Sequence, residues 1–279
     1  MGSDETEKVR QLPIGVFDSG VGGLTVAREI MRQIPNERII YFGDTARVPY
    51  GSKSRETVTK YARQIVRFLK SCHVKAIVIA CNTASSFALD QIEQESDIPV
   101  LGVVKPGVKT AVAATKNKKI GVIATEGTIS SQIYTKYIQA VHPEMEILGK
   151  ACPLFVPLVE EGLLEDPVTD EIAERYLGGL KDLGIDTQIL GCTHYPLIRG
   201  TIGRVMGESV TLVNPAYETA LALKQLLDEQ HLLCETKPGL GENKYRFFVS
   251  DGADKFQHFA KSIFKYGILS AKQINIEEY

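Results

Sequence analysis

The stretch Ile14-Gly15-Val16-Phe17-Asp18-Ser19-Gly20 resembles Ile120-Gly121-Val122-Ile123-Ala124-Thr125-Glu126-Gly127, which begins 106 positions later. Each is a β-branched run followed by small polar residues and glycine, a pattern typical of a buried strand that leads into a helix. A second pair, residues 77–83 (IVIACNT) and 188–194 (QILGCTH), lies 111 positions apart. Because the order and spacing of both landmarks are preserved, the sequence predicts two related halves.

Short apolar runs alternate with longer helical patterns along the whole chain, which indicates an α/β fold with mainly parallel sheets. The helical pattern is clearest over 55–71, where apolar residues recur at i, i+3, i+4 and i+7. The runs that predict strands are 14–17, 39–42, 76–80, 120–123, 188–190 and 245–250. A helix with Phe256, Phe259, Ala260, Ile263 and Phe264 follows the last of them.

We therefore predict two pseudo-symmetric open α/β domains with the active site in the cleft between them. The first domain is expected over 13–101 plus 212–279, because the chain beyond about Leu212 returns to complete it. The second is expected over 102–211.

Composition narrows the classes of function. With 44% hydrophobic and 24% charged residues and a net charge of −2, the chain has neither a disordered composition nor a basic surface for nucleic acid. No apolar run approaches the roughly 20 residues of a membrane span, so a cytoplasmic protein without a membrane partner is predicted. The five cysteines include no CxxC pair, which argues against a disulfide framework or a closed zinc site.

Two of the five cysteines stand out because each directly follows a predicted strand. In open parallel sheets, ligands bind at the carboxyl ends of strands. Cys81 and Cys192 occupy equivalent strand ends in the two halves and precede hydrogen-bonding residues, whereas Cys72, Cys152 and Cys234 fit inert, buried positions. The duplication thus predicts that Cys81 and Cys192 face each other across the cleft.

Two opposed thiols suit the inversion of a carbon centre. Without a cofactor, inversion of an acidic C–H needs a base on one face and an acid on the other. A thiol, with an ordinary pKa of roughly 8.5, reaches either form after modest tuning. Asp18 and His194 are the nearest candidates to tune the two thiols. Asp18 could instead cap a helix that starts near Val21, and a histidine is more often structural than catalytic.

The glycine-rich stretch Gly20-Val21-Gly22-Gly23 would let backbone amides approach an anionic group. It matches neither a Walker A loop nor a full GxGxxG fingerprint, and so points to no nucleotide.

Four motifs, in order, resemble the glutamate racemases of the aspartate/glutamate racemase superfamily, from about Pro13 to the C-terminal helix. They are residues 17–23 (FDSGVGG), 43–45 with 49–51 (GDT and PYG), 80–84 (ACNTA) and 191–197 (GCTHYPL).

This resemblance implies interconversion of L- and D-glutamate, supply of D-glutamate for peptidoglycan synthesis, and chemistry without pyridoxal phosphate, metal or nucleotide. It implies that Cys81 is assisted by Asp18, and Cys192 by His194 and Glu160, although the sequence does not separate Glu160 from Glu161. It also implies a small-molecule substrate and, commonly, a homodimer. The substrate contacts it implies are Asp18, Ser19, Tyr50, Gly51, Asn82, Thr83, Thr193 and His194.

The alternative functions are an aspartate racemase, a thiol hydrolase, a cysteine phosphatase and a binding module. An aspartate racemase would apply the same chemistry to a side chain one methylene shorter, a difference worth only about 1–3 kcal/mol in a pocket. A thiol hydrolase using Cys192 and His194 would explain only half of the duplication. A cysteine phosphatase is disfavoured because six residues separate Cys192 from Arg199, one more than its CxxxxxR loop has. A binding module without catalysis would leave both thiols unexplained.

Overall fold

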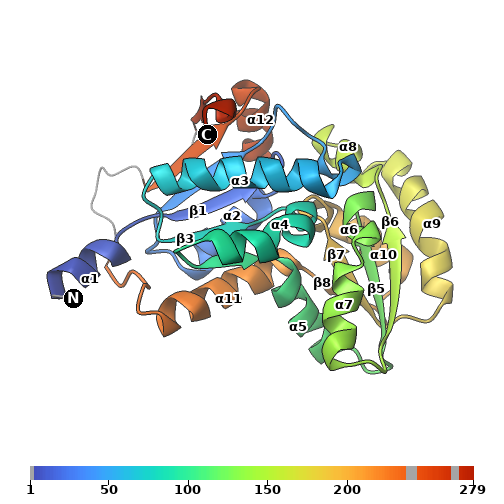
Figure 1. Ribbon diagram of the computed structural model, residues 1–279. Coiled ribbons are helices and arrows are strands. Elements are labelled where there is room, and N and C mark those ends of the chain that lie inside the picture. Colours follow the sequence, from blue (N-terminus) through green and yellow to red (C-terminus); the bar gives the residue numbers. More distant parts are fainter. Residues whose placement is uncertain (1–2, 237–243, 265–269) are drawn as a thin grey trace.

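The computed structural model describes residues 3–236, 244–264 and 270–279 and contains two parallel sheets (Figure 1). The first has the order β10-β9-β2-β1-β3-β4 and the second the order β6-β5-β7-β8. Strands of the first sheet are β1 (Ile14–Asp18), β2 (Ile39–Gly43), β3 (Ala76–Ile79), β4 (Val100–Gly102), β9 (Tyr245–Val249) and β10 (Ala271–Gln273). Strands of the second are β5 (Lys119–Ala124), β6 (Glu146–Ala151), β7 (Thr187–Gly191) and β8 (Thr211–Val213).

The two sheets share one internal order, which confirms the predicted pseudo-symmetric α/β fold. β1 lies between β2 and β3, with β4 beyond β3, and β5 lies in the same way between β6 and β7, with β8 beyond β7. Every neighbouring pair is parallel. The carboxyl ends of β3 and β7, which precede the two cysteines of interest, therefore occupy equivalent places.

The last strands return to the first sheet, since β9 pairs with β2 and β10 pairs with β9. β8 still belongs to the second sheet. The exchange between sheets falls between Val213 and Tyr245, while the domain limits at 101/102 and 211/212 stay a prediction.

Helices cover both faces of each sheet. Residues of α2, α11 and α12 pack on one face of the first sheet and residues of α3 and α4 on the other. On the second sheet, α8, α9 and α10 pack opposite α5 and α7. The α-helices are α1 (Ser3–Arg10), α2 (Leu24–Gln33), α3 (Arg55–Ser71), α4 (Asn82–Glu95), α5 (Val104–Ala114), α6 (Glu126–Ser130), α7 (Ile133–Val141), α8 (Phe155–Glu160), α9 (Pro167–Asp182), α10 (Arg199–Met206), α11 (Pro215–Glu229) and α12 (Ala253–Ile263). The short 3-10 helices among the described residues are η1 (Tyr50–Ser52), η2 (Tyr195–Ile198) and η3 (Ile276–Glu278).

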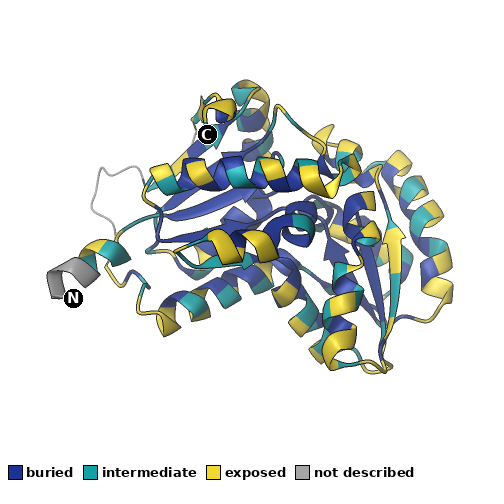
Figure 2. Ribbon diagram, viewed as in Figure 1, coloured by how far each residue is buried: buried dark blue, intermediate teal, exposed yellow. Residues whose placement is uncertain are grey.

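Helix α3 shows why the helical pattern folds as predicted. The Ser54 side chain accepts a hydrogen bond from the Thr57 N–H and caps the first turn. The predicted apolar stripe lies against the sheet, and Val58, Ile65 and Leu69 are fully buried. Figure 2 shows the opposite face of α3 exposed.

Within the part of the chain that the structure describes, no helix has both the length and the apolar character that crossing a bilayer requires.

Candidate active site

A cavity of about 390 Å³ opens where the carboxyl ends of the two sheets meet. Both candidate thiols line it, Cys81 from the first half and Cys192 from the second, and each is only 6% exposed. The other predicted site residues that line it are Ser19, Tyr50, Gly51, Asn82, Thr83, Glu160, Thr193 and His194. Asp18 is fully buried next to this lining, with Thr193 Oγ1 3.5 Å from its Oδ1.

Cys81 follows β3 and is the N-cap of α4. Its Sγ accepts from the Ala84 N–H at 3.5 Å and lies 3.6 Å from the Ser19 hydroxyl. Burial, followed by the nearby charge of Asp18, raises the pKa of Cys81 to about 12. This residue is therefore a protonated thiol at neutral pH.

Asp18 ends β1, and its Oδ2 accepts a hydrogen bond from the Gly20 N–H at 3.0 Å. Burial raises its pKa, while the charge of His194 and bonds from Gly23 and Gly20 oppose that shift. The helix expected to start near Val21 starts at Leu24. Its N-cap residue is Gly23, so no side chain at that position caps the first turn. The carboxylate thus orders the turn before α2 and also meets the cleft through Thr193.

Cys192 has a different partner. Its Sγ lies 3.7 Å from His194 Nδ1, and His194 Nε2 lies 2.9 Å from Glu160 Oε1. Burial alone would lower the pKa of His194, but hydrogen bonds to Cys192 and Glu160 raise it to about 10. His194 is therefore an imidazolium at neutral pH.

The geometry also separates the two glutamates that the sequence leaves equivalent. Glu160, in the last turn of α8, lines the cavity and binds His194. Glu161 is exposed and follows the helix as its C-cap.

Close packing between the halves holds the His194 loop in place. A Cβ built on Gly22 would lie 2.4 Å from Thr193 Oγ1 and 2.5 Å from the His194 ring. The Thr25 hydroxyl donates to the Thr193 carbonyl at 3.0 Å. Because the second half comes this close to the first, a side chain larger than that of glycine does not fit at position 22.

Sequence reasoning missed several polar residues of the cleft. Thr125 lines the cavity, and its hydroxyl lies 2.9 Å from that of Thr83. The Tyr134 hydroxyl donates to Asn82 Oδ1 at 2.7 Å. The internal repeat held a signal for one of them, because Thr125 is the counterpart of Ser19 when the two strand motifs are aligned.

The remaining cysteines lie elsewhere. Cys72 is the C-cap of α3, Cys152 is in the core of the second half, and the Cys234 N–H donates to Glu37. None of them lines the cleft cavity.

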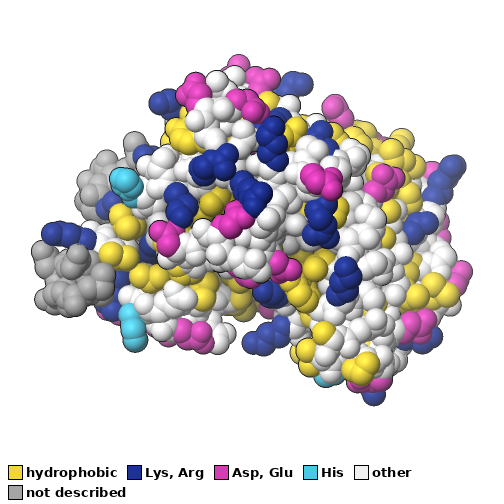
Figure 3. All heavy atoms as spheres, in the orientation of Figure 1, with side chains coloured by type: hydrophobic (Ala, Val, Ile, Leu, Met, Phe, Trp, Pro, Cys, Tyr) yellow, Lys and Arg dark blue, Asp and Glu magenta, His cyan; other side chains and the backbone are white. Residues whose placement is uncertain are grey.

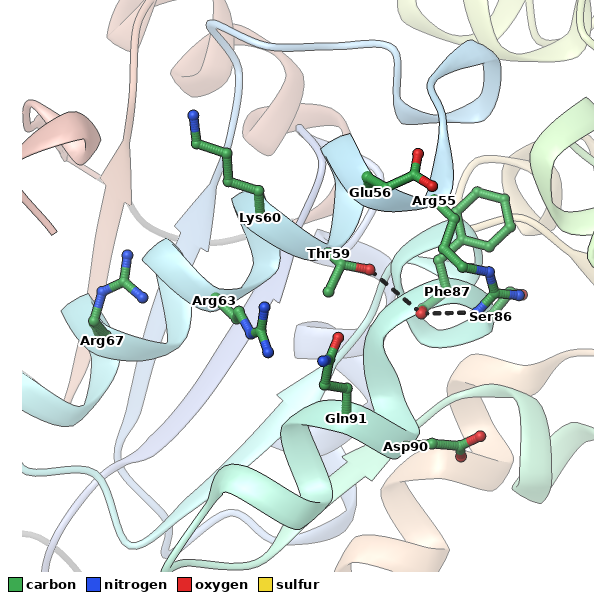
Figure 4. A pocket seen from close by; sticks show the side chains of 10 residues that line it. All are labelled: Arg55, Glu56, Thr59, Lys60, Arg63, Arg67, Ser86, Phe87, Asp90 and Gln91. Atoms are coloured by element: carbon green, nitrogen blue, oxygen red, sulfur yellow. Dashed lines mark hydrogen bonds between the residues drawn. The ribbon is translucent and has the colours of Figure 1, made fainter.

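A second cavity, of about 430 Å³, lies between α3 and α4 (Figure 4). Its walls carry Arg63 and Gln91 but no thiol, and Arg63 pairs with Glu95. Figure 3 shows both signs of charge interspersed on this face. The opposed thiols make the cleft between the sheets the candidate active site.

Comparison with known proteins agrees with this site. The family model described as Asp/Glu/Hydantoin racemase matches residues 14–223. A glutamate racemase from Geobacter metallireducens is 51% identical over 238 residues, covering 85% of this chain and 87% of that protein.

Solved structures show the same similarity. A glutamate racemase isoform from Bacillus anthracis has a TM-score of 0.90 at 40% identity, covering 95% of this chain and 98% of that one. The Francisella tularensis glutamate racemase, solved in complex with D-glutamate, has a TM-score of 0.88 at 39% identity, covering 97% and 100%. The chain therefore belongs to the Asp/Glu/Hydantoin racemase family, as an amino-acid racemase of the glutamate racemase group.

Proposed function

We propose that this enzyme interconverts L- and D-glutamate by a two-base mechanism without a cofactor, and so supplies D-glutamate for peptidoglycan synthesis. One observation carries the proposal: two buried thiols, one from each pseudo-symmetric half, line a single cavity. The named relatives are glutamate racemases, which favours glutamate over aspartate as the substrate. The family resemblance further supports a cytoplasmic homodimer.

The chemistry is a proton exchange at the α-carbon held between the two sulfurs. A thiolate on one face takes the α-proton, and the C–H electron pair stays on the carbon, delocalised into the α-carboxylate. The thiol on the other face then donates its proton to that carbon. Each cysteine ends in the form that the other began with, so the opposite enantiomer is accepted in the reverse direction.

The surroundings of the thiols fit this exchange. Burial keeps Cys81 protonated, so it can serve as the acid on its face. His194 is an imidazolium at neutral pH and lies 3.7 Å from Cys192 on the other face. Asp18, His194 and Glu160 are the groups proposed to assist.

Substrate is proposed to be held by hydroxyl, amide and backbone groups rather than by a cationic clamp. Ser19, Asn82, Thr83 and Thr193 line the cavity and offer hydrogen-bonding groups for two carboxylates and an ammonium group.

The test is an assay with pure L-glutamate and no added cofactor. Optical rotation is expected to fall to zero, and in D₂O deuterium is expected at the α-position of the product. L-aspartate assayed in parallel should racemise at least about ten times more slowly, as one methylene of pocket fit allows. A strict requirement for pyridoxal phosphate, or faster turnover of aspartate, would contradict the proposal.

A thiol hydrolase has one observation in its favour, the chain of contacts from Cys192 through His194 to Glu160. It gives no role to Cys81. Hydrolysis of activated esters that survives Cys81→Ser, together with absent racemisation in the unmodified enzyme, would favour it instead.

A further inference from the structure

A buried carboxylate, that of Asp44, lies behind the segment that carries Tyr50 and Gly51. Asp44 is fully buried and follows β2. Its oxygens accept from Arg47 Nε at 2.8 and 3.0 Å and from the Ser250 hydroxyl at 2.9 Å. The Tyr50 hydroxyl also donates to Asp44 Oδ2. The carboxylate therefore joins the β2 loop to the end of β9 and to the wall of the cleft.

This contact decides how Tyr50 meets the cleft. Tyr50 is 1% exposed as a whole residue, and its hydroxyl is bound to Asp44. The backbone of the segment reaches the cavity at Gly51, which is partly exposed and lines it. The position of that backbone depends on the Tyr50–Asp44 bond.

Arg47 holds Asp44 from the other side and connects it to two further elements. One terminal nitrogen of its guanidinium donates to Gln64 Oε1 of α3 at 2.6 Å and to Glu277 Oε1 of η3 at 2.8 Å. The group also lies 4.0 Å from the centre of the Tyr61 ring. A planar fork makes these contacts at once, whereas a lysine ammonium has a single nitrogen and makes only some of them.

The C-terminal η3 helix completes the cluster. Ile276 is buried among residues of α3, which seats η3 on that helix. Glu277 then accepts from Gln64 Nε2 at 3.1 Å as well as from Arg47. The hydrogen bond from Gln64 and the Arg47 charge hold the pKa of Glu277 below its usual range.

We propose that Arg47 is a positioning residue for substrate binding, which fixes the Tyr50–Gly51 segment through Asp44 and is itself oriented by Glu277 of the C-terminal helix. The proposal rests on the proposed function in one respect, the contact of Tyr50 and Gly51 with substrate. It predicts that losing these contacts loosens substrate binding more than it slows proton transfer, because the thiols are held by other groups.

The experiment compares Arg47→Lys and Glu277→Gln with two matched controls, Arg63→Lys on α3 and Glu278→Gln in η3. For L-glutamate, Arg47→Lys should raise KM about tenfold with kcat within about twofold, and Glu277→Gln should raise KM about threefold. The controls should match the unmodified enzyme. Unchanged KM in both test variants, or a loss confined to kcat, would overturn the proposal.

Two further readouts keep the test decisive. If Arg47→Lys does not fold, Glu277→Gln decides alone, because Glu277 is 59% exposed and its replacement should leave the fold intact. Amide hydrogen exchange over residues 47–53 needs no catalysis, and it should accelerate in Arg47→Lys but not in Arg63→Lys. Absent glutamate turnover in the unmodified enzyme would refute the proposed function, whereas unchanged exchange would refute the role of Arg47.

Discussion

On one side of the cleft Cys81 meets two neutral groups, the Ala84 N–H and the Ser19 hydroxyl, whereas on the other Cys192 lies beside a histidine that binds a glutamate. The backbone positions are equivalent, because both cysteines follow corresponding strands of sheets with the same order. The electrostatic surroundings are not. Duplication thus explains why the thiols come from opposite halves, and the unlike neighbours give the two thiols different electrostatic surroundings.

The difference has a chemical use. The proposed inversion needs one acid and one base at the same moment. Burial keeps Cys81 in its acid form, and the imidazolium of His194 lies beside Cys192 on the other side.

The largest expected effect comes from removing either thiol. Cys81→Ser and Cys192→Ser should each lower racemisation by more than about 10³-fold, because a hydroxyl is far less acidic than a thiol and each face needs its own group. Polarimetry measures the loss, and circular dichroism checks the fold. Cys72→Ser, at a position outside the cleft, is the control and should keep full activity. Near-normal turnover in either cleft variant would refute the two-base assignment.

The next largest effect should come from replacing His194, which lies beside only one of the two thiols. His194→Asn should lower kcat/KM by about 10²- to 10³-fold, as expected for loss of acid–base assistance. Because two enantiomers have equal free energies, kcat/KM must fall equally in both directions.

The α-deuterium isotope effect in His194→Asn should nevertheless be unequal. It should rise for the enantiomer whose proton Cys192 removes and fall toward unity for the other, because proton removal by Cys81 no longer limits that direction. An equal rise in both directions would show that the two sides share their tuning.

A smaller effect should follow from crowding the same loop. Gly22→Ala places a methyl group within 2.5 Å of Thr193 and His194, so the loop must shift. Displacement on this scale should lower kcat/KM by about 10- to 100-fold. The matched control is Gly179→Ala in α9, where an added Cβ meets no atom within 4 Å. That variant should keep its activity and gain up to about 1 kcal/mol of stability.

The smallest effect concerns the pH dependence of stability. The pKa of His194 is raised from 6.5 to about 10, so its contribution to stability is complete below pH 6.5 and is lost as pH rises through about 10. Glu160→Gln removes the negative charge that helps to raise this pKa. The decline in melting temperature across that pH window should therefore be shallower in Glu160→Gln than in the unmodified enzyme or in Glu161→Gln. Equal slopes in all three would exclude a charged partner for His194. Cys81 contributes in the same direction above its ordinary pKa, equally in all three proteins.

The sequence predicted the interior strands of each sheet and missed those at the sheet edges. β1, β2, β3, β5, β7 and β9 follow the predicted runs within one or two residues. β4, β8 and β10 are three residues long, too short for a periodic signal. β6 lies at a sheet edge, and the exposed residues Glu146 and Lys150 interrupt its apolar pattern.

For the site, the internal repeat predicted which positions face the cleft but not which side chains pair with each other there. It found Cys81, Cys192 and the neighbouring polar residues, because strand ends are visible in the sequence. Choosing Glu160 over Glu161 required the orientation of α8, and the link from Arg47 to Glu277 joins segments too far apart in the chain to leave a local pattern.

The return of β9 to the first sheet sets an order of events during synthesis. The strands of the second sheet all lie between Lys119 and Val213, so that sheet is complete once this stretch has left the ribosome. The first sheet begins earlier and is completed later, because β9, which pairs with β2, is synthesised about 200 residues after it. Until then the β2 edge, next to the loop that carries Asp44 and Arg47, is unpaired. A nascent chain at that stage presents an open strand edge on which chaperones or other chains can act.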